Sequence, residues 1–162
     1  MNKYTTWQVS VLVAFRLLIG WHLLYEGIAK LLNPHWTSEA FLRESQWILS
    51  GIADFILSNP SLLPIVDFLN TWGLIAIGCG LILGLFARIA SLCGAILLLI
   101  YYLNVPPLLG IEYTLPSDSN YLIINKTLIE AIGLLVLYSF STSYIVGLDI
   151  FFHRFVKKSK DI

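Results

Sequence analysis

The sequence predicts an all-α integral membrane protein, a four-helix transmembrane bundle with an amphipathic interfacial helix between spans one and two. The 162 residues are 57% hydrophobic and only 12% charged, whereas soluble domains contain about 25% charged residues. The mean hydropathy is +0.79. Four apolar runs are each long enough to cross the hydrocarbon core, which takes about 20 residues. We expect residues 1–162 to form a single transmembrane domain.

The four apolar runs are interpreted as helices, because backbone polar groups in lipid must be satisfied within their own segment. We expect the first to remain as an uncleaved span, since no small-residue cleavage site follows it. The expected spans are residues 9–32, 65–86, 89–109 and 121–140.

The second and third spans are joined by a tight turn at "FARIA" and are expected to form an antiparallel hairpin. Small residues recur on both spans, at Ala76, Gly80 and Gly84 on one and at Ala90 and Gly94 on the other. Small residues allow helix backbones to approach closely. We therefore expect these two spans to pack tightly through them.

Residues 37–58, between the first two spans, have an amphipathic pattern. Their apolar residues fall near helical spacing with charged residues between them, at Phe41, Ile48, Ile52, Phe55 and Ile56. One interpretation is a helix that lies on the membrane surface. The other is a loop helix that packs against the bundle.

The distribution of positive charge predicts the orientation of the chain. Lys3, Arg88 and the lysine-rich tail at residues 149–162 lie on one side of a four-span protein, whereas the opposite loops are mainly acidic. Lysine and arginine favour the cytoplasmic side. Both termini are therefore expected in the cytoplasm.

Composition and motifs argue against several functions. The formal net charge is zero, which gives no electrostatic reason to expect nucleic-acid binding. Cys79 and Cys93 form neither a CxxC motif nor a metal-ligand spacing, so they are interpreted as packing residues and no metal site is expected. His22 has no second histidine at its depth, which argues against a bis-histidine haem. No intrinsic cofactor is expected.

The first span contains ionisable residues in the stretch "GWHLLYEGIAKLL". His22, Glu26 and Lys30 follow one another at intervals of four, so they share one face of a helix. Charged groups inside a bilayer are costly, and they face the bundle interior or a cavity. This face is therefore expected to form one wall of a polar site.

The polar residues of all four spans fall in the same outer half of the membrane, because successive spans run in opposite directions. We expect an outward-opening pocket in which Glu26, Lys30, Lys126 and Glu130 form one ion-pair network. The residues expected in the pocket are His22, Tyr25, Glu26, Lys30, Asn70, Trp72, Tyr101, Asn104, Asn125, Lys126 and Glu130.

Simpler interpretations of these polar residues stay open. Glu26 with Lys30, and Lys126 with Glu130, have the spacing of pairs that stabilise a single helix. The lysines can also extend to the head groups. Aromatic residues such as Trp72 and Tyr101 also fit an interfacial belt.

Four stretches carry a resemblance to a known family: "RLLIGWHLLYEGIAKL", "WGLIAIGCGLILGLFARIASL", "NKTLIEAIGLLVL" and "GLD" at 147–149. Together they resemble the DoxX/DoxD family of small four-helix membrane proteins. The resemblance implies a multi-pass protein of the bacterial inner (cytoplasmic) membrane. Some members are subunits of a thiosulfate:quinone oxidoreductase, and others are linked to thiol and oxidative-stress chemistry. The positions that match recurring family residues are Arg16, Glu26, Gly27, Lys30, Gly84, Arg88, Asn125 and Lys126.

The pocket and the resemblance together suggest a membrane subunit of a redox system that binds a quinone or a similar amphiphile. Carboxylates and a histidine would then supply protons, and a periplasmic or membrane redox partner would supply electrons. Whether the chain is itself catalytic stays open. The alternative is a non-enzymatic membrane protein that binds lipid or scaffolds a partner. The expected partner in either case is the lipid bilayer, and a homo-oligomer is compatible with the sequence.

Overall fold

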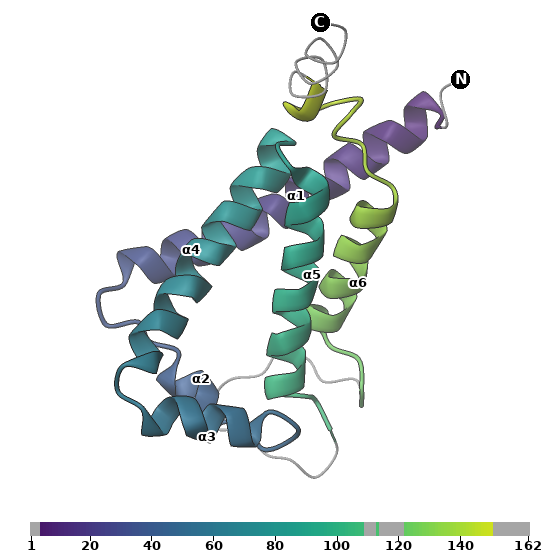
Figure 1. The fold of residues 1–162 in the computed structure, drawn as a ribbon. Coiled ribbons are helices and arrows are strands. Elements are labelled where there is room, and N and C mark those ends of the chain that lie inside the picture. The colour runs from purple at the N-terminus through teal and green to yellow at the C-terminus, as the bar shows by residue number, and fades with distance from the viewer. Residues whose placement is uncertain (1–3, 109–112, 114–121, 151–162) are drawn as a thin grey trace, which may run out of the picture.

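The computed structural model describes residues 4–108, 113 and 122–150, and these residues form an all-helical fold (Figure 1). Three of the described helices are long and apolar enough to cross a membrane. The prediction of an all-α membrane protein is therefore confirmed at this level. The described helices are α1 (Thr6–Leu32), α2 (Glu39–Arg43), α3 (Ser50–Ser58), α4 (Leu62–Leu83), α5 (Ala87–Asn104) and α6 (Lys126–Ser139).

Helices α1, α4 and α5 correspond to the first three predicted spans, with shifted ends that have local causes. α1 starts three residues early because Thr5 and Gln8 form a reciprocal capping box. α4 ends at Leu83 because Gly84 adopts a left-handed conformation with φ of 64°. α5 ends at Asn104, before the predicted residue 109, because prolines at 106 and 107 cannot continue a helix.

Helix α6 is shorter than the predicted fourth span of residues 121–140. It contains 14 residues and begins after Asn125, whose side chain accepts a hydrogen bond from the Leu128 amide. At about 1.5 Å per residue, 14 residues extend about 21 Å, which is less than the roughly 30 Å of the hydrocarbon core. A fourth membrane crossing therefore stays a prediction, and residue 121 lies outside the described part of the chain.

The segment expected to form one amphipathic helix at residues 37–58 contains two short helices, α2 and α3. α2 ends at Arg43, where the Ser45 amide donates back to the Leu42 carbonyl in a tight turn. On α3, Ile52 and Phe55 are exposed. The location of this segment at a membrane surface stays a prediction.

The membrane-length helices and α6 are arranged as two pairs (Figure 1). α1 packs along α4, α5 packs along α6, and α1 touches α6 only sparingly. The pairs converge where residues 84–86 join α4 to α5, which we call the turn end. They diverge toward α2 and α3, which we call the loop end. The core between them contains fully buried leucines at positions 23, 74, 81 and 134.

The closest backbone approach joins α1 to α4. A Cβ atom added at Gly78 would lie 2.6 Å from the backbone nitrogen of Leu24 and 2.8 Å from the carbonyl oxygen of Gly20. Only glycine fits at such a contact. The first and second spans therefore pack through glycine, an arrangement that we did not predict.

The predicted small-residue packing between α4 and α5 is confirmed in part. An added Cβ at Gly80 would lie 3.1 Å from Ala90, and one at Gly94 would lie 3.1 Å from Ile77 of α4 and 3.0 Å from Leu134 of α6, whereas Gly84 faces Gly147. Ala76 is exposed. A four-residue repeat identifies one face of a helix without identifying the helix opposite to it.

The turn end is held together by the segment that follows α6. The Asp149 carboxylate accepts from the Phe86 amide at 2.7 Å, and the Asp149 amide donates to the Gly84 carbonyl at 3.0 Å. Arg16 of α1 is 3% exposed and donates to the Val146 carbonyl at 2.9 Å. These contacts join α1, the α4–α5 turn and the end of the described chain, so they anchor the two helix pairs where they converge.

Candidate functional site

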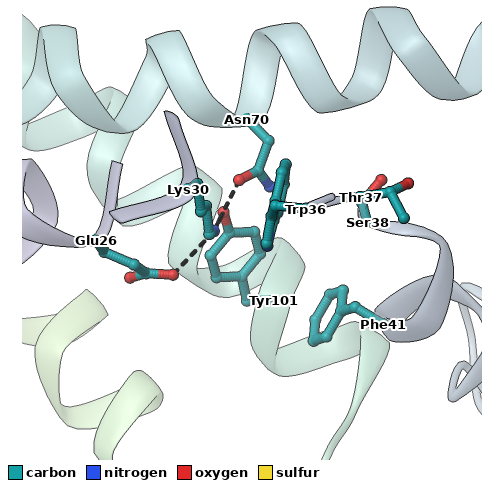
Figure 2. Close-up of a pocket in the computed structure, with 8 residues that line it drawn as sticks. All are labelled: Glu26, Lys30, Trp36, Thr37, Ser38, Phe41, Asn70 and Tyr101. Atoms are coloured by element: carbon teal, nitrogen blue, oxygen red, sulfur yellow. Dashed lines mark hydrogen bonds and ion pairs between the residues drawn. The ribbon is translucent and has the colours of Figure 1, made fainter. Parts of the chain in front are cut away.

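A cavity of about 220 Å³ lies at the loop end, where α1, α4 and α5 meet the connection that leads into α2 (Figure 2). Helices α1, α4 and α5 contribute one part of its wall, and the connection together with Phe41 of α2 contributes the rest. The lining residues are Glu26, Lys30, Trp36, Thr37, Ser38, Phe41, Asn70 and Tyr101.

Lys30 is the central polar group of the cavity (Figure 2). Its ammonium group lies 2.9 Å from the Glu26 carboxylate and donates to the Asn70 side-chain oxygen at 2.8 Å. It also donates to the Tyr101 hydroxyl at 3.4 Å. An ammonium group has three N–H donors, so these partners from α1, α4 and α5 satisfy Lys30 and tie three helices together.

Aromatic rings form the apolar part of the wall. The Lys30 ammonium lies 4.9 Å from the centre of the Trp36 ring and 5.3 Å from that of Tyr101, within the range of a cation–π contact. The Phe41 ring meets the Tyr101 ring edge-on, with centres 5.6 Å apart. The cavity therefore combines one compact polar group with flat apolar surfaces.

Two polar joints hold the connection against the helices. The Ser38 amide and hydroxyl both donate to the same carboxylate oxygen of Asp67 on α4. The side-chain amide of Asn104, at the end of α5, donates to the Phe41 carbonyl at 2.8 Å. Ser38 and Asn104 are both buried, so each joint fixes the connection at a defined distance from a helix.

A second polar pair joins α1 to α6. The Nδ1–H of His22 donates to the Glu130 carboxylate at 2.7 Å, and the Glu130 side chain is 12% exposed. His22 lies four residues before Glu26, which is about 6 Å along the helix. The pair thus lies about one turn from the cavity wall, on the side of the turn end.

A family model named DoxX matches residues 11–106, which is more than half of the chain. The chain belongs to the DoxX family. The matched region includes α1 from residue 11 onward, α2 to α5 and every residue that lines the cavity, whereas α6 with Glu130 lies beyond it. Searches of curated proteins and of solved structures return no match to this DoxX protein.

The structure brings only part of the expected pocket together. Of the residues that we expected in the pocket, Glu26, Lys30, Asn70 and Tyr101 line the cavity of this DoxX protein. Asn104 supports it by holding the carbonyl of Phe41.

The other expected pocket residues have different environments. Asn125 caps α6, and Lys126 is exposed in the first turn of that helix. Tyr25 is 63% exposed, and Trp72 is 47% exposed with its ring near Phe68. These four residues do not line the cavity.

The expected ion-pair network divides differently among the described residues. Glu26 pairs with Lys30 on its own helix, as its spacing indicated, whereas Glu130 pairs with His22 of α1. Glu130 thus pairs with a histidine that the expected network of four residues did not include. The ligand-binding role of all these residues stays a prediction.

Four lining residues were missed because they follow the end of the first span. Trp36, Thr37, Ser38 and Phe41 lie in "HWTSEAF", a mainly polar stretch without a clear period. Two aromatic rings in such a stretch were the available signal, since large rings in a polar loop need an apolar surface to contact.

Proposed function

We propose that this DoxX protein binds the neutral head group of a quinone or a similar amphiphile in the loop-end cavity, as the membrane subunit of a redox system. The observation that carries the proposal is the balanced charge of the cavity wall. Its lining contains one ammonium group and one carboxylate, Lys30 and Glu26, 2.9 Å apart.

This balance favours a neutral ligand over an anionic one. A phosphate head group is best held by positive charge that no carboxylate has already compensated, as in arginine clusters and helix N-termini. The Lys30 charge is compensated by Glu26, and the Glu26 carboxylate would repel a second anion. A ligand with carbonyl oxygens and no charge therefore fits the wall better than a phospholipid head group.

The size of the cavity indicates how much of the ligand enters. Pockets that enclose a whole drug-sized molecule measure about 300–1,000 Å³, and this cavity measures about 220 Å³. It suits a single substituted ring. The apolar tail of an amphiphile would then stay in the surrounding lipid.

The polar wall can exchange hydrogen bonds and protons with such a ring. The Tyr101 hydroxyl accepts from Lys30 and keeps its own proton, which it can donate to a carbonyl oxygen. Quinone reduction takes up two electrons and two protons. Glu26 at the wall, with His22 and Glu130 about one turn away, are groups of the type that act as proton donors, and a partner protein would supply the electrons.

We also propose that the chain crosses the bacterial inner membrane four times, with both termini in the cytoplasm and the loop end outside. The first turn of α1 and the last described residues lie at the same end of the molecule (Figure 1), as an even number of crossings requires. The exposed apolar residues of α3, Ile52 and Phe55, support its contact with the outer membrane surface.

Cysteine labelling tests this topology. With Cys79 and Cys93 replaced by serine, single cysteines are placed at Thr5 and at Asn59. A membrane-impermeant maleimide should label the Asn59 position in intact cells and the Thr5 position only after permeabilisation. Labelling of both positions in intact cells would contradict the proposed arrangement.

Ligand binding tests the functional proposal directly. A fully substituted quinone analogue should bind the purified protein saturably in detergent and raise its melting temperature by mass action. Lys30→Met should weaken both effects, whereas Arg88→Ala should not, because Arg88 stacks on Tyr138 near the turn end. Mass spectrometry that finds phospholipid in the cavity, with no quinone binding, would support the lipid-binding or scaffold alternative.

A further inference from the structure

The connection that follows α1 and the helix α2 together form half of the cavity wall, yet little apolar burial holds this segment in place. No residue of α2 itself is buried. The buried groups that attach this segment are polar: Ser38 and Asn104 are each 3% exposed. The position of the segment is therefore set mainly by hydrogen bonds.

These hydrogen bonds place two aromatic side chains at the cavity. Ser38, with two bonds to Asp67 of α4, lies two residues after Trp36. The Phe41 carbonyl is itself the acceptor from Asn104. A buried hydrogen-bonding group that loses its partner is costly. Trp36 and Phe41 are consequently held against opposite helix pairs, α1–α4 and α5–α6.

Each of the two rings also contacts a neighbouring side chain of the cavity. Phe41 lies edge-on to Tyr101, at 68° between the ring planes, and Trp36 lies beside the Lys30 ammonium (Figure 2). Rotation of either ring would break one of these contacts. The apolar walls of the cavity are therefore flat and fixed rather than adaptable.

We propose that Trp36 and Phe41 are specificity-determining residues that favour a planar ring over a puckered ring with the same polar groups. This inference rests on the proposed function of the same cavity and adds a selection by shape. Lys30 and Tyr101 can donate hydrogen bonds to a carbonyl oxygen, and planar and puckered diones both have such an oxygen. Only the aromatic walls can distinguish the thickness of the ring that carries it.

A matched pair of ligands tests the selection. One is a 1,4-benzoquinone with three methyl groups and a decyl chain, and the other is the cyclohexane-1,4-dione with the same substituents. Full substitution blocks addition of the exposed Cys93 thiol to the quinone ring. Titration calorimetry in detergent gives the ratio of the two affinities. Wild type should favour the planar ligand about threefold to tenfold, the range for ring-on-ring contacts.

Substitutions in the wall should remove this preference. Trp36→Leu and Phe41→Leu should each bring the affinity ratio close to one, while Trp36→Tyr, which keeps a flat ring, should retain most of it. Trp47→Leu and Phe55→Leu are matched controls, because both residues are exposed and neither lines the cavity. The controls should keep the wild-type ratio.

The possible outcomes separate this inference from the functional proposal. A wild-type ratio in both Trp36→Leu and Phe41→Leu would overturn the inference, and so would an equal loss in the two controls. Equal binding of both ligands by wild type would also overturn it while leaving the functional proposal intact. A wild-type protein that binds neither ligand would overturn both.

Discussion

The glycine contact between α1 and α4 gives a sharp test of the packing. Gly78→Ala adds a methyl group whose carbon would lie 2.6 Å from the Leu24 nitrogen and 2.8 Å from the Gly20 carbonyl oxygen. Ordinary contacts begin near 3.4 Å, so the two helices must separate by nearly an ångström. Both obstructing atoms belong to backbone, and no side-chain rotation can relieve the clash.

The expected cost follows from this geometry. Overpacking a core costs about 1–3 kcal/mol, and a backbone clash belongs in the upper part of that range, at about 2–3 kcal/mol. Replacing glycine by alanine inside a helix returns about 0.5–1 kcal/mol. Gly78→Ala should therefore destabilise the protein by about 1–2.5 kcal/mol.

Gly73→Ala is the matched control on the same helix. An added Cβ at Gly73 has no neighbour within 4 Å, so only the helix-propensity gain remains and the variant should be more stable by about 0.5–1 kcal/mol. Both variants are compared by reversible unfolding in mixed micelles of detergent and dodecyl sulfate, followed by circular dichroism. Equal stabilities for the two variants would refute close packing of α1 on α4.

Three further substitutions test the polar contacts. His22→Ala and Glu130→Gln should each lower the free energy of unfolding by about 1–3 kcal/mol. The double variant should lose little more than either single variant, because both changes break the same hydrogen bond. Additive losses in thermal unfolding would contradict the pairing of His22 with Glu130. Lys30→Met should lower the affinity for the quinone analogue at least tenfold in titration calorimetry, because the Tyr101 hydroxyl loses the ammonium that polarises it. An unchanged affinity in this variant would show that Lys30 takes no part in binding. Asp149→Ala should lower the free energy of unfolding by about 1.5–3 kcal/mol in the same unfolding assay, because it removes the charged acceptor of the Phe86 amide. Asp149→Asn should lower it by less. An Asp149→Ala variant as stable as wild type would show that this hydrogen bond contributes no stability.

The existence of the membrane helices could be predicted well from the sequence, since apolar length is a strong local signal. The ends of α1, α4 and α5 depended on weaker local chemistry: the capping box at Thr5, the left-handed Gly84 and the prolines after Asn104. These signals shifted the ends by up to five residues. The two helices α2 and α3 were harder, because the start of that segment is held by bonds that Ser38 donates to Asp67 and that Asn104 donates to the Phe41 carbonyl.

The partners of the polar residues could be predicted only within one helix. Glu26 and Lys30 pair at the spacing that their positions indicated. Glu130 is different, because its partner His22 lies on another helix and their contact depends on how α1 and α6 are oriented. Helical periodicity predicts which face a residue occupies, but the residue opposite to it depends on tertiary packing.

The pair of His22 and Glu130 also has a consequence for how the chain is made. The two residues are 108 positions apart, and at about 5–20 residues per second the ribosome needs about 5–20 s to pass from one to the other. During that interval α1 has already emerged with His22, Glu26 and Lys30 on one face. Asn70 and Tyr101 are synthesised before Glu130, so the hydrogen bonds of Lys30 at the cavity wall can form first. The His22 imidazole can bond to the Glu130 carboxylate only after α6 has been synthesised. This hydrogen bond therefore forms late in assembly.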